Sequence, residues 1–329
     1  MNTIVATVRP RKRASVLGLL GLLSLGAAPP PSSQPAEGPP PLPIKQLLDV
    51  RVSFLARGEK GRLAVLADDD GVVVPYRLEG GAWQKLPLPP PFDLATASSA
   101  VGMYFGRDDR PRLMGYRVTE QGARILYLRH RDGAWNDQRR EVSALGREDA
   151  ALFGELGEAD PEIVCRAGGE CLLKSRKGWT LYRTTPPKEA VTRGFFGRAY
   201  ALTSDGLYRG EATAFVRLGD TGPWRTRTTG FWVGPTGEAV VVEPAADALH
   251  VLDPASGRWT TRTSPVPGPR DVAGPAEDRL IVGDGGLVRV SGAGATRLGA
   301  PSLRLDRVIM LEDHAVAAGP SGVFLIGGK

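Results

Sequence analysis

Two tryptophans and two arginines share a short segment whose residue types suit binding. The segment TGPWRTRTTGFWVGP contains Trp224, Arg225, Arg227 and Trp232. Tryptophan and arginine side chains often carry much of the binding energy at interfaces, and indole rings also stack on sugars. We therefore take these four residues as candidate binding residues. The alternative is that both indoles pack between strands in a sheet core.

Other residues whose types could support catalysis or metal binding are not arranged for it. The aspartates of residues 68–70 are consecutive, whereas calcium loops usually place carboxylates at alternate positions. His130, His250 and His314 lie far apart, and neither a Gly-x-Ser-x-Gly nucleophile motif nor a phosphate-binding loop is present. The sequence thus predicts no catalytic residue, no metal site and no cofactor. A protein without enzymatic activity is the favoured interpretation.

The two cysteines flank one tight turn. Cys165 and Cys171 lie in EIVCRAGGECLLK, where two apolar runs surround a turn containing Gly168 and Gly169. A hairpin of this form places the cysteines opposite each other, which predicts a disulfide and an oxidising compartment. Their spacing differs from a redox Cys-x-x-Cys motif, and no histidine lies close enough in sequence to suggest a zinc site.

The N-terminus has the form of an export signal. Basic residues precede the apolar run ASVLGLLGLLSLGAA, which ends at Ala28 and is shorter than the ~20 residues of a membrane span. Residues 1–28 are therefore expected to be a signal peptide or an N-terminal membrane anchor. Pro29 argues against cleavage directly after Ala28, so both alternatives stay open. Residues 29–43 are rich in proline and predict an extended linker.

The charge of the chain does not indicate a nucleic-acid partner. The formal net charge is +6, but residues 9–13 supply much of it, and the first acidic residue is Glu37. No block of lysine and arginine follows that would form the basic surface of a nucleic-acid-binding protein. We expect no nucleic-acid partner, and membrane contact only through an uncleaved anchor.

The remaining chain repeats one pattern of strands and turns. The segment LTSDGLYRGEATAFVRLG at residues 202–219 recurs in similar form as VGDGGLVRVSGAGATRLG at residues 282–299, and both end in Arg-Leu-Gly. Seven such units alternate apolar and polar residues around a glycine-containing turn, and several place a tryptophan after a later turn. The units begin at Arg62, Pro111, Glu162, Ala199, Gly237, Asp278 and His314.

Units of about 40 residues with short alternating strands are typical of β-propeller blades. The 42 glycines and 28 prolines also favour many tight turns over helices. We predict an all-β domain over residues 44–329: a β-propeller of seven blades with four antiparallel strands each. Six blades are the alternative, because the segments around Glu148 and Arg193 are irregular. The strand-like residues 47–57 would complete the last blade or begin the first, removing a free edge.

The sequences of the units resemble those of a known group of proteins. ALTSDGLYR, LIVGDGGLVRV and the stretch from Arg107 to Gln138 are similar to blades of bacterial extracytoplasmic β-propellers with sialidase-like, Asp-box-like turns. The resemblance implies a propeller fold outside the cytoplasm. In such turns the aspartate stabilises the fold, so we interpret Asp205 as structural.

These observations predict a monomeric, periplasmic or secreted propeller. Its expected function is non-catalytic: a binding or scaffold module in the cell envelope, whose partner is a protein or a glycan. The alternative function is that of a carbohydrate-active enzyme, a sialidase-like hydrolase or lyase. Arginines and carboxylates converging on the central channel would favour that alternative, since a fold alone does not decide function.

Overall fold

The computed structural model describes strands and turns within one compact unit, Gly38–Lys329. The segment expected to be the signal lies outside the described residues, as does the proline-rich linker except for residues 42 and 43. No helix among the described residues is long and apolar enough to cross a bilayer. The described residues are 42–57, 62–69, 72–87, 98–105, 110–119, 122–137, 151–152, 162–166, 170–175, 178–183, 191–195, 198–211, 214–311 and 313–327.

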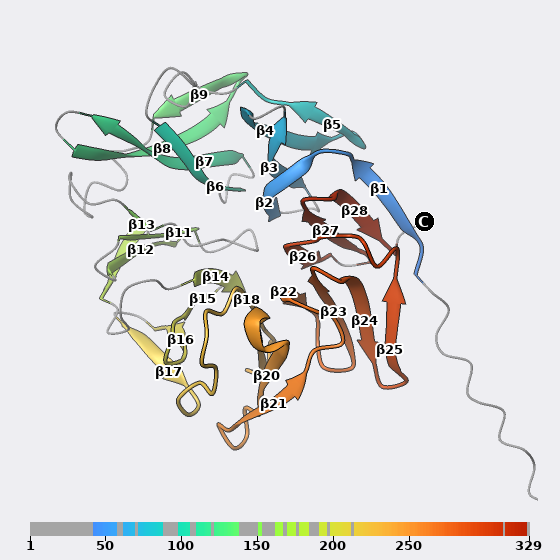
Figure 1. Ribbon diagram of the computed structural model, residues 1–329. Helices are drawn as coiled ribbons and strands as arrows, with labels where there is room; N and C mark the ends of the chain where they lie inside the picture. The colour runs from blue at the N-terminus through green and yellow to red at the C-terminus, as the bar shows by residue number, and fades with distance from the viewer. Residues whose placement is uncertain are drawn as a thin grey trace, which may run out of the picture. The chain divides into compact units, whose positions relative to one another are not determined.

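The strands of this unit form seven four-stranded antiparallel sheets (Figure 1). In six of them the strands lie in chain order. The first three sheets contain β2 (Arg51–Arg57), β3 (Leu63–Asp69), β4 (Val72–Glu79) and β5 (Ala82–Lys85); β6 (Ser98–Phe105), β7 (Pro111–Thr119), β8 (Gly122–Arg131) and β9 (Ala134–Asp137); and β10 (Ala151–Leu152), β11 (Glu162–Arg166), β12 (Glu170–Ser175) and β13 (Gly178–Arg183).

The next three sheets follow the same order, and one of them includes the short 3-10 helix η4. They contain β14 (Val191–Phe195), β15 (Arg198–Leu202), β16 (Leu207–Gly210) and β17 (Phe215–Leu218); β18 (Gly230–Val233), β19 (Ala239–Glu243), η4 (Pro244–Ala246), β20 (Ala248–Leu252) and β21 (Trp259–Thr263); and β22 (Pro269–Ala273), β23 (Asp278–Gly283), β24 (Gly286–Ser291) and β25 (Gly294–Leu298).

The seventh sheet joins the two ends of the unit. Its strands are β26 (Arg307–Met310), β27 (Ala315–Gly319), β28 (Gly322–Ile326) and, on the outer edge, β1 (Ile44–Leu48). β1 pairs with β28 so that Ile44 lies opposite Ile326, and the N–H of Gly327 donates to the carbonyl oxygen of Pro43 at 2.9 Å. The expected N-terminal strand is therefore two strands: β1 completes the last sheet, and β2 begins the first.

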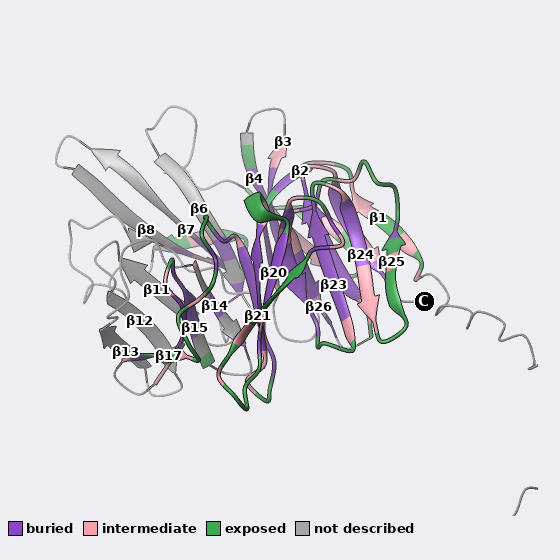
Figure 2. Ribbon diagram, turned by 60° about the horizontal axis from the view of Figure 1, so that its bottom comes forward, coloured by how far each residue is buried: buried purple, intermediate pink, exposed green. Residues whose placement is uncertain are grey.

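The strands β2, β18, β22 and β26 lie innermost in their sheets and face strands of neighbouring sheets (Figure 1). β2 contacts β6, β26 and β27, while β22 contacts both β18 and β26. All residues of β18 and β19 are buried, whereas the outer strand β21 is almost wholly exposed. Figure 2 shows the same change from buried inner strands to exposed outer strands. Val240 and its neighbours are buried on both faces because each sheet packs between two others.

The recurring tryptophan joins one sheet to the preceding one. Trp135 on β9 donates its indole N–H to the carbonyl oxygen of Pro87 after β5, at 2.6 Å. Trp259 on β21 donates to the carbonyl oxygen of Asp220 after β17, at 3.2 Å. The equivalent Trp83 packs on the apolar cluster shared by the first and last sheets. The repeated residue thus stabilises the contact between sheets as well as its own strand.

Candidate functional site

The structure separates the four candidate binding residues into two pairs. Trp224 and Trp232 are buried, with 5% and 7% of their surface exposed, whereas Arg225 and Arg227 are exposed. Trp224 donates its indole N–H to the carbonyl oxygen of Thr203 at 2.9 Å. Both rings therefore pack inward, and of the four candidate residues only the two arginines reach solvent. A binding role for these four residues stays a prediction.

The backbone around Trp224 is fixed by a buried glutamate. One oxygen of Glu243 accepts the N–H groups of Arg225 and Thr226 at 2.8 and 2.6 Å, and the other lies 2.9 Å from Nε2 of His250. Burial alone would raise the pKa of Glu243, but the hydrogen bonds from Thr226, Arg225 and His250 hold that pKa below its ordinary value. His250 also contacts the hydroxyl of Thr261 at 3.0 Å, so both of its ring nitrogens have structural partners.

The turn that contains Asp205 is closed by side chains. The Asp205 carboxylate accepts the hydroxyl groups of Thr203 and Tyr208 at 2.6 and 2.9 Å. The hydrogen bond from Thr203 is the main reason that the pKa of Asp205 lies below its ordinary value. These contacts agree with a structural role for this aspartate.

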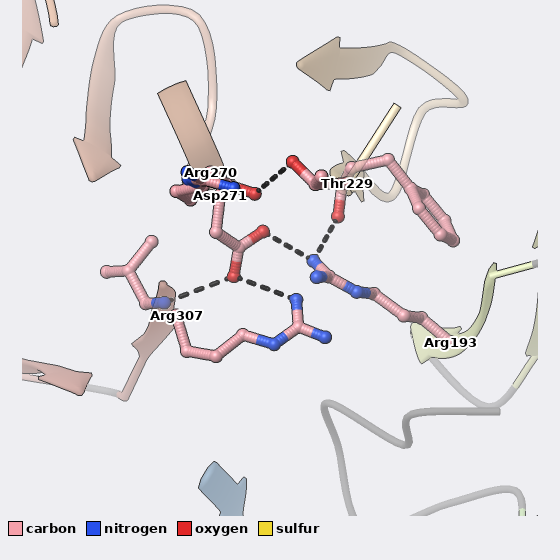
Figure 3. A network of polar contacts seen from close by, with 7 residues as sticks. Arg193, Thr229, Arg270, Asp271 and Arg307 are labelled. Atoms are coloured by element: carbon pink, nitrogen blue, oxygen red, sulfur yellow. Dashed lines mark hydrogen bonds and ion pairs between the residues drawn. The ribbon is translucent and has the colours of Figure 1, made fainter. Parts of the chain in front are cut away.

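A carboxylate and two arginines meet between the inner strands (Figure 3). Asp271 on β22 lies 2.6 Å from the guanidinium of Arg193 on β14 and 3.4 Å from that of Arg307 on β26. Arg193 also donates to the carbonyl oxygen of Phe231 on β18 at 2.7 Å, and the N–H of Val308 donates to Asp271 at 3.1 Å. One carboxylate thereby connects the inner strands of four sheets.

This central cluster leaves little open space. Burial raises the pKa of Asp271, while the guanidinium of Arg193 and the N–H of Val308 act in the opposite direction. The cavity beside the cluster, which Trp232 and Leu55 also line, measures about 40 Å³. Small-molecule sites usually measure about 300 to 1,000 Å³. No histidine is among the described residues that line this cavity.

A larger cavity of about 470 Å³ opens between the first and second sheets. β4 contributes Arg77 and the end of β8 contributes His130 and Arg131, while Arg110 directly precedes β7. Asp132 occupies the β8–β9 turn with φ of 52°, a left-handed conformation that aspartate tolerates. We call this cavity the arginine cleft. Its polar lining consists of Arg62, Arg77, Gln84, Arg110, His130, Arg131 and Asp132.

His130 is buried at the wall of the arginine cleft. It pairs across the hairpin with Trp135, and the two rings meet edge to face at 5.1 Å. Burial, together with the positive charges of Arg77 and Arg110, lowers the pKa of His130. Among the described residues, Nε2 of His130 has no hydrogen-bond partner. The ring therefore lines the cleft and carries a buried polar atom without a hydrogen-bond partner among the described residues.

Sequence reasoning missed this site. From the sequence alone His130 is interpreted as a strand or turn residue, and the arginines that surround it come from segments that are far apart along the chain. The only local signal was the run RHRDG, in which charged residues and histidine meet a hairpin turn. In the described part of the chain, no group of three or more His, Cys, Asp or Glu could hold a metal ion.

No protein-family model and no curated protein sequence matches the chain. Its similarities lie among solved structures. It resembles virginiamycin B lyase from Staphylococcus aureus, with 13% identity over 87% of this chain and 98% of that chain and a TM-score of 0.57. It also resembles YCF48 bound to D1 peptide, with 17% identity over 90% and 97% of the two chains and a TM-score of 0.60.

A third similar structure is the extracellular domain of the putative one component system BT4673 from B. thetaiotaomicron. The identity is 13% over 87% of this chain and 40% of that chain, with a TM-score of 0.55. At such identities these similarities establish the fold and nothing about activity. Together with the seven sheets they confirm the predicted all-β propeller fold. The sialidase-like resemblance of the blades stays a prediction.

Proposed function

We propose that the protein is an exported, non-catalytic propeller that binds a partner protein in the cell envelope. The observation that carries this proposal is the pairing of the central carboxylate. Asp271 is 3% exposed at its side chain and is shared between Arg193 and Arg307, so it is not available to a substrate. The space for a ligand lies instead at the surface, in the arginine cleft. Propellers commonly present binding residues on loops held by a rigid scaffold.

Export is supported by the N-terminal sequence and by the cysteines. Residues 1–28 would direct the chain out of the cytoplasm and either be removed or remain as an anchor, and residues 29–43 would hold the propeller away from that point. β11 and β12 place Cys165 opposite Cys171, the arrangement that a disulfide in an oxidising compartment requires. Among the similar structures, YCF48 is bound to a peptide and the BT4673 domain is extracellular.

Crosslinking in intact cells of the source organism tests the proposal. The full chain with a C-terminal tag would be crosslinked and purified, and its partners and mature N-terminus identified by mass spectrometry. We expect one or two envelope proteins to be captured reproducibly. A secreted protein with no captured partner would contradict the binding role.

The central cluster also favours a second candidate, a carbohydrate-active hydrolase or lyase, since two arginines and a carboxylate do converge between the inner strands. The small cavity argues against it, because a sugar ring does not fit in about 40 Å³. Incubating the protein with sialosides, polygalacturonate and chitin oligomers tests this candidate. Turnover that Asp271→Asn abolishes in a folded variant would establish it.

A further inference from the structure

We propose that the arginine cleft binds a carboxylate-rich peptide segment of a partner protein. This inference deepens the proposed binding function and rests on it. Four properties of the cleft favour such a ligand: its charge, its unpaired polar atoms, its shape and its rigidity.

The charge of the cleft is positive. Its described lining holds four arginines and a single carboxylate, that of Asp132. The guanidiniums of Arg77 and Arg110 are partly shielded, with 23% and 35% of their side-chain surface exposed. Arg77 is also paired with Glu79, which holds its side chain in place. Shielded and pre-oriented guanidiniums bind carboxylates more strongly than flexible surface lysines do.

Two buried polar atoms at the cleft have no partner among the described residues. They are Nε2 of His130, a residue with 6% exposure, and Nε of Arg77. Buried polar groups usually have hydrogen-bond partners, and an unpaired one needs a physical explanation. An anionic ligand supplies it, because the N–H of Arg77 can donate to a carboxylate, and so can that of His130 in its Nε2–H tautomer.

The shape of the surface favours an extended chain. A second hollow of about 470 Å³ lies beside the arginine cleft, and the two share Arg131 and Asp132. The second hollow adds Arg129 and Asn136, so basic and amide groups continue along one path. No Trp, Tyr or Phe is among the described lining residues of either hollow, and hence neither offers a ring for sugar stacking. A peptide with several acidic side chains fits this path better than a glycan or a small anion.

The cleft is held open by a bond between its two walls. The hydrogen bond from Trp135 to the carbonyl oxygen of Pro87 fixes the second sheet against the first, and Pro87 itself lines the cleft. Leu86, which is buried beside it, donates its backbone N–H to the carbonyl oxygen of Pro75 at 2.8 Å. A site held in its binding geometry loses less conformational entropy when the ligand arrives.

Fluorescence anisotropy with a labelled decaglutamate peptide tests the proposal, with decaglutamine as the neutral probe and free glutamate as the small anion. We expect the full chain to bind decaglutamate alone at physiological salt. The variant Arg110→Gln/Arg131→Gln should bind at least tenfold more weakly. The matched control is Arg258→Gln/Arg262→Gln, which removes two exposed arginines from a different sheet and should leave the affinity unchanged.

A substitution that is expected to strengthen binding distinguishes a loss of binding contacts from a folding defect. Asp132→Asn removes the one carboxylate among the described lining residues and keeps a residue type that tolerates positive φ. We expect it to raise the affinity for decaglutamate roughly threefold. A folding defect could not produce that gain.

Three results would overturn the proposal: equal binding by the wild type and Arg110→Gln/Arg131→Gln, binding of free glutamate as tight as that of decaglutamate, or tighter binding of polygalacturonate through the same arginines. The crosslinking experiment distinguishes a failure of this inference from a failure of the proposed binding function. If Arg110→Gln/Arg131→Gln still captures the cellular partner, the cleft inference fails alone. If the wild type captures none, the binding function fails.

Discussion

The indole N–H of Trp135 and the carbonyl oxygen of Pro87 are 2.6 Å apart, although 48 residues separate them in the chain. Their hydrogen bond connects the outer strand of the second sheet to the loop that leaves the first. Because Pro87 lines the arginine cleft and Trp135 packs against His130, one contact sets both the spacing of two sheets and the geometry of the candidate site.

Trp135→Phe keeps a ring in place and removes only the indole donor. We expect the free energy of unfolding to fall by about 1 kcal/mol and the affinity for decaglutamate to fall several-fold. Trp259→Phe is the control, since it removes the equivalent bond to Asp220 on a distant sheet. It should lower stability similarly in urea unfolding and leave binding unchanged. Equal effects of both variants on binding would argue against a special role for the Trp135 contact.

Removing the central carboxylate should be far more costly. Asp271→Ala leaves Arg193 and Arg307 facing each other in a buried site, with side-chain exposures of 5% and 14%. We expect a loss of about 3 to 5 kcal/mol in the free energy of unfolding. Asp278→Ala, which breaks the more exposed pair with Arg289, should cost about 1 kcal/mol or less. Similar losses in the two variants would mean that the central cluster does not hold the inner strands together.

The Glu243 carboxylate should make the free energy of unfolding depend on pH. Its pKa in the fold lies below the ordinary value of 4.5, so folding favours the ionised form. This contribution is fully present above pH 4.5 and is lost as the pH falls through the lower, folded-state pKa. Glu243→Gln removes that component, and its free energy of unfolding should therefore decline less than that of the wild type between pH 5 and about pH 3. Parallel curves for the two proteins would contradict the assignment.

Binding of an acidic peptide should depend on the protonation of His130. Arg77, Glu79, Arg110 and Asp132 surround this ring, and burial with the two arginines lowers its pKa in the free protein. A bound carboxylate would raise that pKa, so the affinity for decaglutamate should increase as the pH falls from about 7.5 to about 6. In His130→Gln the affinity should stay level over this range. If the affinity of His130→Gln depended on pH as that of the wild type does, His130 would not belong to the site.

Cys165 and Cys171 should form a disulfide in the exported protein. They are opposite partners in the β11–β12 pairing. Intact mass before and after reduction should differ by two hydrogens, and Cys165→Ser should lower the free energy of unfolding by about 2 to 3 kcal/mol. Alkylation of both thiols in the native, unreduced protein would show that the prediction is wrong.

The propeller could be predicted from the sequence because its units repeat short apolar runs at a regular interval and its turns carry glycine. The inner strands could not, since a strand such as β18 is short, buried along its whole length and shows no alternation. That the Trp224 side chain points inward could also not be predicted from the sequence. Its ring lies over Gly222, where a Cβ would stand 2.2 Å from an indole carbon, and only the folded chain reveals that contact.

The arginine cleft was hidden for a related reason. Arg77 and Arg131 are each one polar residue among others in their strands, and Arg110 directly precedes another strand. They become one site only because neighbouring sheets bring separate hairpins together. Sites assembled from several repeats leave no motif at a fixed spacing, whereas the segment with Trp224 and Trp232 suggested a binding surface because tryptophan and arginine are dense in it.

The pairing of β1 with β28 makes the two ends of the propeller interdependent during synthesis. β1 precedes the other described strands along the chain, yet its one neighbour among them is β28, which follows all the others. Any nascent or truncated chain that lacks β28 therefore carries an unpaired, sticky edge that proteases and chaperones can recognise. The ring cannot close before β28 has been made. Closing it pairs residues that are far apart in the sequence, and contacts of this kind form slowly. A chain therefore completes its seventh sheet, and covers this edge, only after β28 has been made.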